Sequence, residues 1–220
     1  MSEFSTIFDW DGVVIDSSAQ HERSWELLSA EVGKTLPPGY FKKSFGKKNE
    51  IIIREVLSWS FDPGEIQRLG DRKEELYREI VRQTGITVLP GARELLAALK
   101  AAGIARAIGS STPRKNLDAI FESTGLGEFF QAIVSADDVV HGKPAPEVFL
   151  KAASLLGAPP ARCAVFEDAL FGIEAARRAG MKVVAVATTN PLDALCHADR
   201  AVESLESISP ADLQTLFPPV

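Results

Sequence analysis

The fold of this chain is decided by the stretch Ile7-Phe8-Asp9-Trp10-Asp11-Gly12-Val13-Val14. Its apolar residues predict a short buried strand, and two aspartates separated by one residue lie where that strand ends. Side chains at positions i and i+2 of a strand point to the same face, about 7 Å apart, so we expect the Asp9 and Asp11 carboxylates to project together. Gly12 permits a sharp exit from the strand. Two like charges at the end of a core strand are unfavourable unless a cation or a proton relieves their repulsion, so the pair predicts a chemical function.

The composition is that of a globular protein with one large domain, or with one domain and a small insertion. The chain has 220 residues, of which 45% are hydrophobic and 25% charged, and a net charge of -6 argues against a nucleic-acid-binding surface. The first residues lack the features of a signal peptide, and no run of about 18 apolar residues predicts a transmembrane helix. Two cysteines, Cys163 and Cys196, are too few for a disulfide framework or a zinc site. We therefore expect a cytoplasmic protein, monomeric by default, that binds neither nucleic acid nor membranes.

After residue 88 the sequence alternates between predicted strands and predicted helices. Short apolar runs suited to strands covered on both faces occupy residues 104–110, 132–136, 163–167 and 182–187, and residues 6–10 add a first strand. Helical spacing fills residues 91–102, 113–124, 146–156 and 169–179, and each of these helices is followed by a glycine suited to a left-handed cap. Alternating βαβ units predict an α/β fold with a mainly parallel sheet and helices on both faces.

Residues 17–87 follow a different pattern. Helical spacing occupies residues 19–32, 49–59 and 63–84, with proline and glycine breaks between them and no convincing strand. We interpret this segment as a helical insertion that closes over the strand ends as a cap. The predicted domains are therefore a core of residues 1–16 and 88–220 and a cap of residues 17–87.

Ligands of parallel α/β sheets bind beyond the carboxyl ends of the strands, so the residues there form the candidate site. Gly109-Ser110-Ser111-Thr112-Pro113 follows one predicted strand, and it is either a plain capped helix start or an anion site. Lys143 lies in a proline-stiffened loop after the next strand, where a solvated surface lysine is the alternative. Glu167 and Asp168 follow a further strand, and their alternative role is to cap the helix that begins there.

Together the residues at these strand ends suit a single kind of reaction. The carboxylates of Asp9, Asp11, Glu167 and Asp168 repel one another, and an oxygen-only set of ligands suits Mg²⁺ rather than zinc or copper. A lysine and hydroxyl donors supply the positive side for a phosphoryl group. The strand ends therefore predict phosphoryl transfer.

Four segments resemble the ordered motifs of the haloacid dehalogenase (HAD) superfamily. They are Asp9-Trp10-Asp11-Gly12-Val13, Gly109-Ser110-Ser111, Gly142-Lys143-Pro144-Ala145-Pro146 and Phe166-Glu167-Asp168-Ala169-Leu170-Phe171-Gly172-Ile173-Glu174-Ala175-Ala176. Order, spacing and the helical insertion after the first motif agree over nearly the whole chain. The resemblance is to the branch that contains β-phosphoglucomutases and sugar-phosphate phosphatases, and it implies a HAD-like Rossmannoid core with an inserted cap domain.

The resemblance also implies a role for each motif residue. Asp9 is then the nucleophile that forms an aspartyl-phosphate, and Asp11 protonates the leaving oxygen and later deprotonates the attacking water. The family's dehalogenases lack an acid-base aspartate at the position of Asp11, so this residue favours phosphate esters as substrates.

The remaining implied roles concern the metal ion and the phosphoryl oxygens. The implied Mg²⁺ ligands are the Asp9 carboxylate, the Asp11 backbone carbonyl and Asp168, with Glu167 close by or acting through water. The implied phosphoryl-binding groups are Ser110, the Ser111 amide and Lys143.

The insertion carries the substrate-binding residues that the resemblance implies, which are His21, Gly46, Lys47, Lys48, Asn49 and Lys73. A structural or exposed histidine is the alternative for His21, and a solvated basic edge is favoured for Lys42 and Lys43. The mutases carry a lysine before Gly46 and an arginine three residues after it, where this chain has Phe45 and Asn49. An arginine fork for a second phosphate is therefore missing at this point.

We predict a Mg²⁺-dependent phosphatase that acts on a small phosphorylated metabolite, a sugar or polyol phosphate. A β-phosphoglucomutase-like phosphotransferase is the second hypothesis. A catalytically silent relative with a binding or regulatory role is the third, and it is disfavoured because the motif residues are all retained. Flavin-precursor and nucleotide-like phosphates stay open as substrates.

Overall fold

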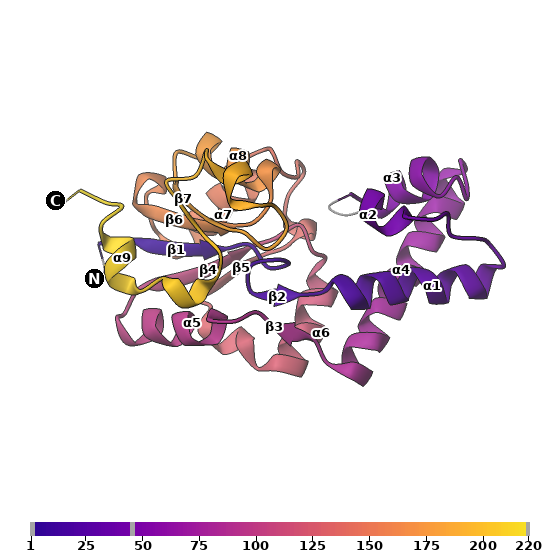
Figure 1. The fold of residues 1–220 in the computed structure, drawn as a ribbon, viewed down its shortest axis with the longest axis horizontal. Coiled ribbons are helices and arrows are strands. Elements are labelled where there is room, and N and C mark those ends of the chain that lie inside the picture. Colours follow the sequence, from indigo (N-terminus) through magenta and orange to yellow (C-terminus); the bar gives the residue numbers. More distant parts are fainter. Residues whose placement is uncertain (1–2, 45–46, 219–220) are drawn as a thin grey trace. The chain divides into compact units, whose positions relative to one another are not determined.

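The computed structural model describes residues 3–44 and 47–218, and the chain divides into two compact units (Figure 1). Unit 1 comprises Met1–Asp16 and Thr87–Val220, and unit 2 comprises Ser17–Ile86. Each unit has its own hydrophobic cluster of buried residues.

Unit 1 is built on a six-stranded sheet with the strand order β5-β4-β1-β6-β7-β8. Its strands are β1 (Ser5–Phe8), β4 (Ala105–Gly109), β5 (Ala132–Val134), β6 (Cys163–Glu167), β7 (Lys182–Val186) and β8 (Arg200–Val202). All neighbouring strands are parallel, so the predicted α/β class with a mainly parallel sheet is confirmed. The edge strand β8 was not predicted, because a three-residue strand with only one buried side chain carries no apolar run.

Helices cover both faces of this sheet, with α7 and α8 on one face and α5 and α6 on the other (Figure 1). The bounds of the unit 1 helices are Ala92–Ala101 for α5, Arg114–Thr124 for α6, Glu147–Leu156 for α7, Leu170–Arg178 for α8 and Pro210–Gln214 for α9. Ile7 of β1 packs in one cluster with Phe149 of α7 and Ile173 of α8. The next residue, Phe8, is also buried and stacks on Phe166, with 4.4 Å between the ring centroids. Because β1 is buried on both faces, the apolar residues Ile7 and Phe8 follow one another directly and do not alternate with exposed polar residues.

Short elements complete unit 1. Strands β2 (Ile15–Asp16) and β3 (Thr87–Val88) form a two-stranded antiparallel ribbon. The expectation that residues 17–87 contain no strand is therefore wrong at Thr87, because a two-residue strand is too short to show a period. The 3-10 turns are η2 (Leu126–Phe129), η3 (Ala136–Asp138), η4 (Pro160–Arg162), η5 (Leu192–Leu195) and η6 (Leu205–Ser207).

Unit 2 is helical, as predicted. Its elements are α1 (Ser18–Val32), α2 (Tyr40–Ser44), α3 (Asn49–Ile51), the π-helical turn η1 (Ile52–Val56) and α4 (Pro63–Thr84). Buried residues of α1 and α4, among them Trp25 and Leu69, share one cluster with Ile53 of η1. The single helix expected over residues 49–59 is wrong, because the chain leaves the α-helix at Ile52 and Ser58 has a left-handed φ of 53°. A left-handed residue cannot continue a right-handed helix.

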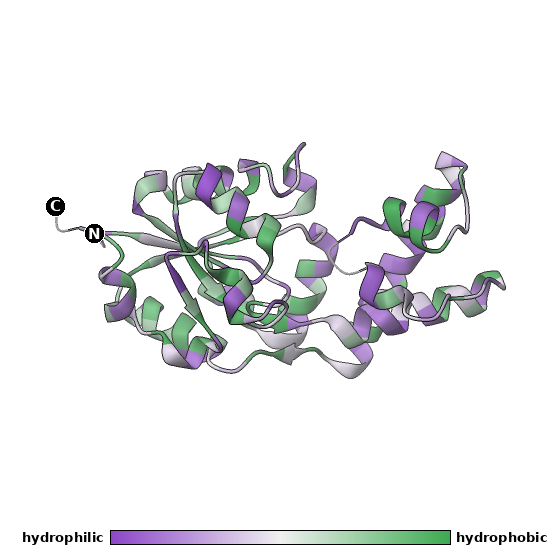
Figure 2. Ribbon diagram, turned by 45° about the horizontal axis from the view of Figure 1, so that its top comes forward, coloured by the Kyte–Doolittle hydropathy of each residue, from purple (hydrophilic) through white to green (hydrophobic). Residues whose placement is uncertain are grey.

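The hydropathy pattern agrees with this arrangement. Hydrophobic residues, drawn green in Figure 2, are concentrated along the central strands, and hydrophilic ones lie on the outer turns of the helices. Among the described residues, α4 is the longest helix with 22 residues, and its Lys73 is buried. No helix in residues 3–44 and 47–218 is long and apolar enough to cross a membrane.

Candidate active site

Three carboxylates meet where β1 and β6 end. β1 and β6 are neighbours with Phe8 in register with Phe166, so Asp9 and Glu167 follow at the same level of the sheet. Asp9, Glu167 and Asp168 are all buried, and each offers an oxygen within 4.8 Å of the others. These three acids were predicted to lie at one edge of the sheet, and the structure places them there.

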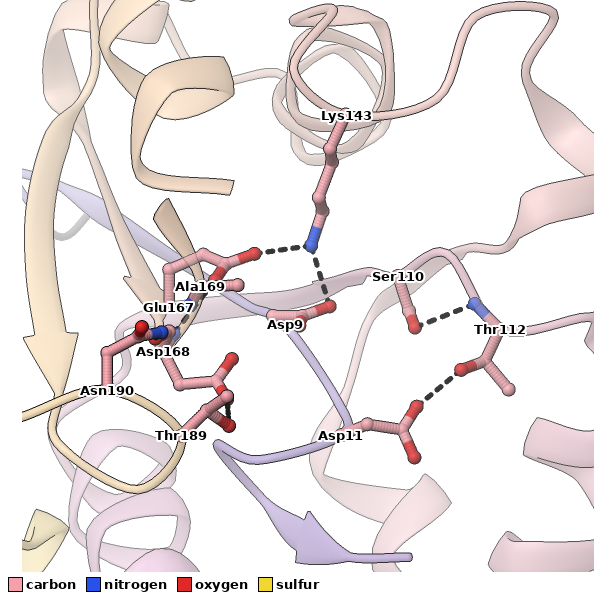
Figure 3. A network of polar contacts seen from close by, with 10 residues as sticks. All are labelled: Asp9, Asp11, Ser110, Thr112, Lys143, Glu167, Asp168, Ala169, Thr189 and Asn190. Carbon is pink, nitrogen blue, oxygen red and sulfur yellow. Dashed lines mark hydrogen bonds and ion pairs between the residues drawn. The ribbon is translucent and has the colours of Figure 1, made fainter. Parts of the chain in front are cut away.

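β1 is shorter than expected, and this changes how the aspartate pair is presented. The strand ends at Phe8, although the Asp9 N–H still donates to the Phe166 carbonyl at 2.9 Å. Asp11 lies beyond, in a turn where the Gly12 N–H donates to the Ile15 carbonyl. The expectation that Asp9 and Asp11 project together from one strand face is therefore wrong, since strand alternation no longer applies to them. Figure 3 shows Asp9 directed toward Lys143 and Asp11 directed toward Thr112.

Lys143 supplies the positive charge of the cluster. Its Nζ lies 2.7 Å from Asp9 Oδ1 and 2.6 Å from Glu167 Oε1, and its side chain is 9% exposed. Burial lowers the pKa of Lys143, but the attraction of the Asp9 and Glu167 carboxylates outweighs this and raises the pKa above its usual value. Lys143 is therefore a charged, buried cation, which excludes the alternative of a solvated surface lysine.

Glu167 links the lysine to the start of α8. While Oε1 accepts from Lys143, Oε2 accepts from the backbone N–H groups of Asp168 at 2.8 Å and Ala169 at 2.7 Å. The helix-capping alternative considered for the acid pair is not supported, because α8 begins at Leu170 and its N-cap residue, Ala169, has no side-chain cap hydrogen bond. Burial raises the pKa of Glu167, and the nearby Asp9 charge adds to this effect against the opposing Lys143.

Asp168 is held by the segment that follows β7. The Thr189 hydroxyl donates to Asp168 Oδ2, and the Asn190 amide donates to the Asp168 carbonyl at 2.9 Å. Burial, together with the charges of Glu167 and Asp9, raises the pKa of Asp168 to about 8. Thr189 and Asn190 were not predicted as site residues, although a polar run follows the strand predicted to end near residue 187.

These carboxylates fit a hard divalent cation. All donors are oxygens, and three buried acids face one lysine, so their charges are only partly compensated. The pKa values of Glu167 and Asp168 are raised by burial and by a repulsion among these carboxylates that is not fully compensated, and a bound cation would reduce that repulsion. Oxygen donors of this kind suit Mg²⁺. The Asp11 carboxylate is not a member of this described group, and its backbone carbonyl stays a predicted ligand.

Asp11 is bound by a residue with no predicted catalytic role. The Thr112 hydroxyl donates to Asp11 Oδ2 at 2.5 Å. The expectation that the helix over residues 113–124 begins at Pro113 is wrong. α6 begins at Arg114, Pro113 precedes it, and the Arg114 N–H donates to the Asp137 carboxylate at 3.0 Å.

The predicted anion-binding serines lie in the same turn. Ser110 is buried, and its Oγ accepts a hydrogen bond from the Thr112 N–H at 3.0 Å, whereas Ser111 is exposed. Both follow β4, the neighbour of β1, so the structure brings them to the edge that carries Asp9.

Unit 2 gathers several of the predicted substrate-binding residues into a polar cluster of its own. The Lys73 Nζ lies 2.7 Å from His21 Nδ1 and 3.0 Å from Glu74 Oε1, and the Asn49 amide donates to the same glutamate oxygen at 2.7 Å. Lys73 is 2% exposed and lies over the rings of Trp25 and Tyr77. Burial, aided by the Lys73 charge and opposed by Glu74, lowers the pKa of His21 to about 3.

The neutral His21 therefore accepts from Lys73 at Nδ1 and carries its proton on Nε2. Of the other residues predicted in unit 2, Lys47 and Lys48 are exposed. Gly46 lies outside the residues that the structure describes.

Comparison with known proteins identifies the class. A model of the haloacid dehalogenase-like hydrolase family matches residues 6–180, and the chain belongs to that family. The predicted fold family and the type of enzyme are thus confirmed. Family membership, with phosphatases among the relatives, supports the predicted phosphoric monoester hydrolase activity.

Two relatives and one solved structure illustrate the range of similar proteins. The chain is 39% identical over 213 residues to 5-amino-6-(5-phospho-D-ribitylamino)uracil phosphatase, chloroplastic, of Arabidopsis thaliana, and the match covers 96% of the chain but 57% of that relative. It is 34% identical to β-phosphoglucomutase of Mycobacterium tuberculosis, covering 81% of the chain and 78% of that relative. The structure of CbbY from Rhodobacter sphaeroides, solved in complex with phosphate, is similar with a TM-score of 0.86 and 25% sequence identity. The match covers 97% of this chain and 99% of the CbbY chain.

Proposed function

We propose that this protein is a Mg²⁺-dependent phosphatase that hydrolyses a small sugar or polyol phosphate through an aspartyl-phosphate intermediate. One observation carries the proposal. The buried Asp9 carboxylate lies 2.7 Å from a charged lysine and close to two further acids, while Asp11 is held separately by Thr112. A nucleophile and an acid-base group with different environments suit two-step phosphoryl transfer.

In the first step, an Asp9 oxygen attacks the phosphorus atom and the bond between phosphorus and the substrate's ester oxygen breaks. Asp11 donates a proton to that oxygen, and the alcohol leaves. In the second step, Asp11 takes a proton from water, the water oxygen attacks the phosphorus atom, and the bond to Asp9 breaks to release inorganic phosphate. Both steps are balanced, since the proton given by Asp11 returns from water.

The surrounding residues stabilise charge. Asp9 and Asp168, with the Asp11 carbonyl and Glu167 nearby, would hold Mg²⁺, which supplies charge neutralisation for the transferring phosphoryl group. Lys143 and the Ser110–Ser111 turn add positive charge and hydrogen-bond donors for its oxygens.

We propose that unit 2 acts as the cap that selects the substrate. Its cluster pairs the buried Lys73 with Glu74, and Asn49, which stands where the mutases have an arginine, donates to that same glutamate. This arrangement favours hydroxyl groups over a second phosphate at that point. A polyol phosphate fits this preference, and the relative with 39% identity is named for a phosphorylated ribityl compound.

Phosphate release from a panel of substrates tests the proposal. The panel contains ribitol 5-phosphate, glucose 6-phosphate, β-glucose 1-phosphate, flavin mononucleotide and AMP, each assayed with Mg²⁺ and with EDTA. Wild type should release phosphate only with Mg²⁺, and Asp9→Asn should reduce release to background while retaining the wild-type circular dichroism spectrum. Asp193→Asn, the same change at an exposed aspartate, is the matched control and should remain active.

Three outcomes would contradict the proposal. A mutase would convert β-glucose 1-phosphate to an isomeric sugar phosphate, dependent on a bisphosphate and with little free phosphate. A silent relative would turn over no member of the panel. Full activity of Asp9→Asn would contradict the mechanism itself.

A further inference from the structure

The hydrogen bond between Thr112 and Asp11 is not explained by the architecture of the turn in which Thr112 lies. The residue is 8% exposed, and its hydroxyl donates to Asp11 Oδ2 at 2.5 Å across 101 positions of sequence. The start of α6 does not use this hydroxyl, since Asp137 accepts from the Arg114 N–H. The Thr112 side chain is therefore directed to a residue of the reaction centre rather than to its own helix.

The backbone of Thr112 is fixed on both sides. Its N–H donates to Ser110 Oγ at 3.0 Å, and its carbonyl accepts from the Ala136 N–H at 3.0 Å. Pro113 follows with φ of -59°, which restricts the chain further. A hydroxyl on such a rigid backbone holds its acceptor in one place.

The contact also distinguishes the two oxygens of Asp11. A hydrogen bond donated to Oδ2 fixes the rotation of the carboxyl group about its Cβ–Cγ bond. Figure 3 shows this carboxyl group apart from the cluster of Asp9, Glu167 and Asp168.

We propose that Thr112 is a positioning residue that orients the Asp11 carboxyl group for proton transfer to the ester oxygen of the substrate. The inference rests on the proposed phosphatase function. Thr112 acts through Asp11 and transfers no proton itself. Its loss therefore slows the departure of alcohols that need a proton and spares leaving groups that do not.

The dependence of the rate on the leaving group distinguishes a positioning role of Thr112 from a purely structural one. p-Nitrophenolate leaves without protonation, whereas the alkoxide of a polyol phosphate requires an acid. The parameter to compare is kcat/KM, because it covers the steps through release of the alcohol and excludes hydrolysis of the phosphoenzyme. General acid catalysis contributes about 100- to 10,000-fold, and misorientation should forfeit part of that.

The experiment compares p-nitrophenyl phosphate with the alkyl phosphate of the panel that wild type hydrolyses best. Thr112→Val should lower kcat/KM by about 10- to 100-fold for the alkyl phosphate and by less than about 3-fold for p-nitrophenyl phosphate. Thr112→Ser, which keeps the hydroxyl, should restore the alkyl phosphate rate to within about 3-fold of wild type. The matched control is Thr124→Val, whose hydroxyl donates to the Ile120 carbonyl at the other end of α6 and whose loss should leave both rates unchanged.

Equal losses for both substrates in Thr112→Val, or no loss for either, would overturn the positioning role while leaving the phosphatase proposal intact. Wild type that releases phosphate from neither substrate would instead overturn the phosphatase proposal. If Thr112→Val fails to fold, Thr112→Ala gives the same comparison with a smaller side chain.

Discussion

Gly172 lies against the carboxylate of Glu167, and a methyl group at its Cα would be 1.6 Å from Glu167 Oε1. That oxygen is the one that accepts from Lys143. The absence of a side chain at Gly172 thus allows Glu167 to accept both from Lys143 and from the backbone N–H groups of Asp168 and Ala169, just before α8 begins. The glycine is part of the site although it carries no functional group.

Gly172→Ala should destabilise the protein and impair the site together. Inserting a methylene into a packed interior costs about 1 to 3 kcal/mol, and here it also forces Glu167 away from Lys143. We expect a lower free energy of unfolding in urea and a lower kcat. Gly70→Ala is the control, because its new methyl group would be in ordinary contact, 3.4 Å from Asn49 Cβ, and alanine favours the helical state of α4. A fully active, equally stable Gly172→Ala would contradict this reading of Glu167.

Lys143→Met should unfold more easily than wild type when Mg²⁺ is removed. Breaking a buried ion pair costs about 3 to 5 kcal/mol, since Asp9 and Glu167 are left without their cation. Added Mg²⁺ should recover part of the loss, measured as a shift in the melting temperature with and without EDTA. Lys100→Met is the matched control, because Lys100 pairs with Glu128 at an exposed site and should contribute less than about 0.5 kcal/mol. Equal effects of the two variants would show that burial of the Lys143 pair has no energetic consequence.

Thr189→Val should weaken Mg²⁺ binding. The Thr189 hydroxyl donates to Asp168, and removing a hydrogen bond that orients a metal ligand typically reduces metal affinity by about 10- to 100-fold. Isothermal titration of the protein with MgCl₂ measures this directly and independently of activity. Thr189→Ser keeps the hydroxyl and should bind Mg²⁺ as wild type does. Unchanged affinity in Thr189→Val would exclude an orienting role.

His21 should make stability depend on pH in the acidic range. Its pKa is about 3 in the folded protein, mainly because of burial, against an ordinary value of 6.5. As pH falls below about 6.5, the unfolded chain takes up a proton that the folded protein does not, so His21 contributes stability above that pH and loses it on acidification. Between pH 7 and pH 5 the expected loss is about 1 to 2 kcal/mol.

His21→Gln should remove that part of the pH dependence. Urea unfolding followed by tryptophan fluorescence reports on it, because Trp25 lies in the same cluster as His21 and Lys73. The exposed His197→Gln is the matched control and should keep the wild-type slope. A His21→Gln protein with the wild-type slope would mean that His21 is not held neutral.

Much of the fold could be predicted because buried parallel strands produce apolar runs that need no partner to be recognised. β6 and α4 have the predicted bounds, and the glycines after four helices have left-handed φ values as expected. The very short strands β3 and β8 were not predicted, because two or three residues are too few to show a hydrophobic period. The end of the helical segment after η1 was also not predicted, since Ser58 adopts a left-handed φ that serine does not favour.

The sequence by itself determined which chemistry this protein carries. Asp9, Glu167 and Asp168 lie at the ends of apolar runs, and the carboxyl ends of parallel strands meet at one edge, so the convergence of these three acids follows from topology. Lys143 reaches them from the loop between β5 and α7. The tertiary structure alone decided how each group is held. Thr112 to Asp11, Thr189 to Asp168 and Lys73 to His21 are contacts between residues at least 21 positions apart. Most of these side chains lie in turns beyond regular strands and helices, where no periodicity gives their direction, and only the packed chain sets which one meets which.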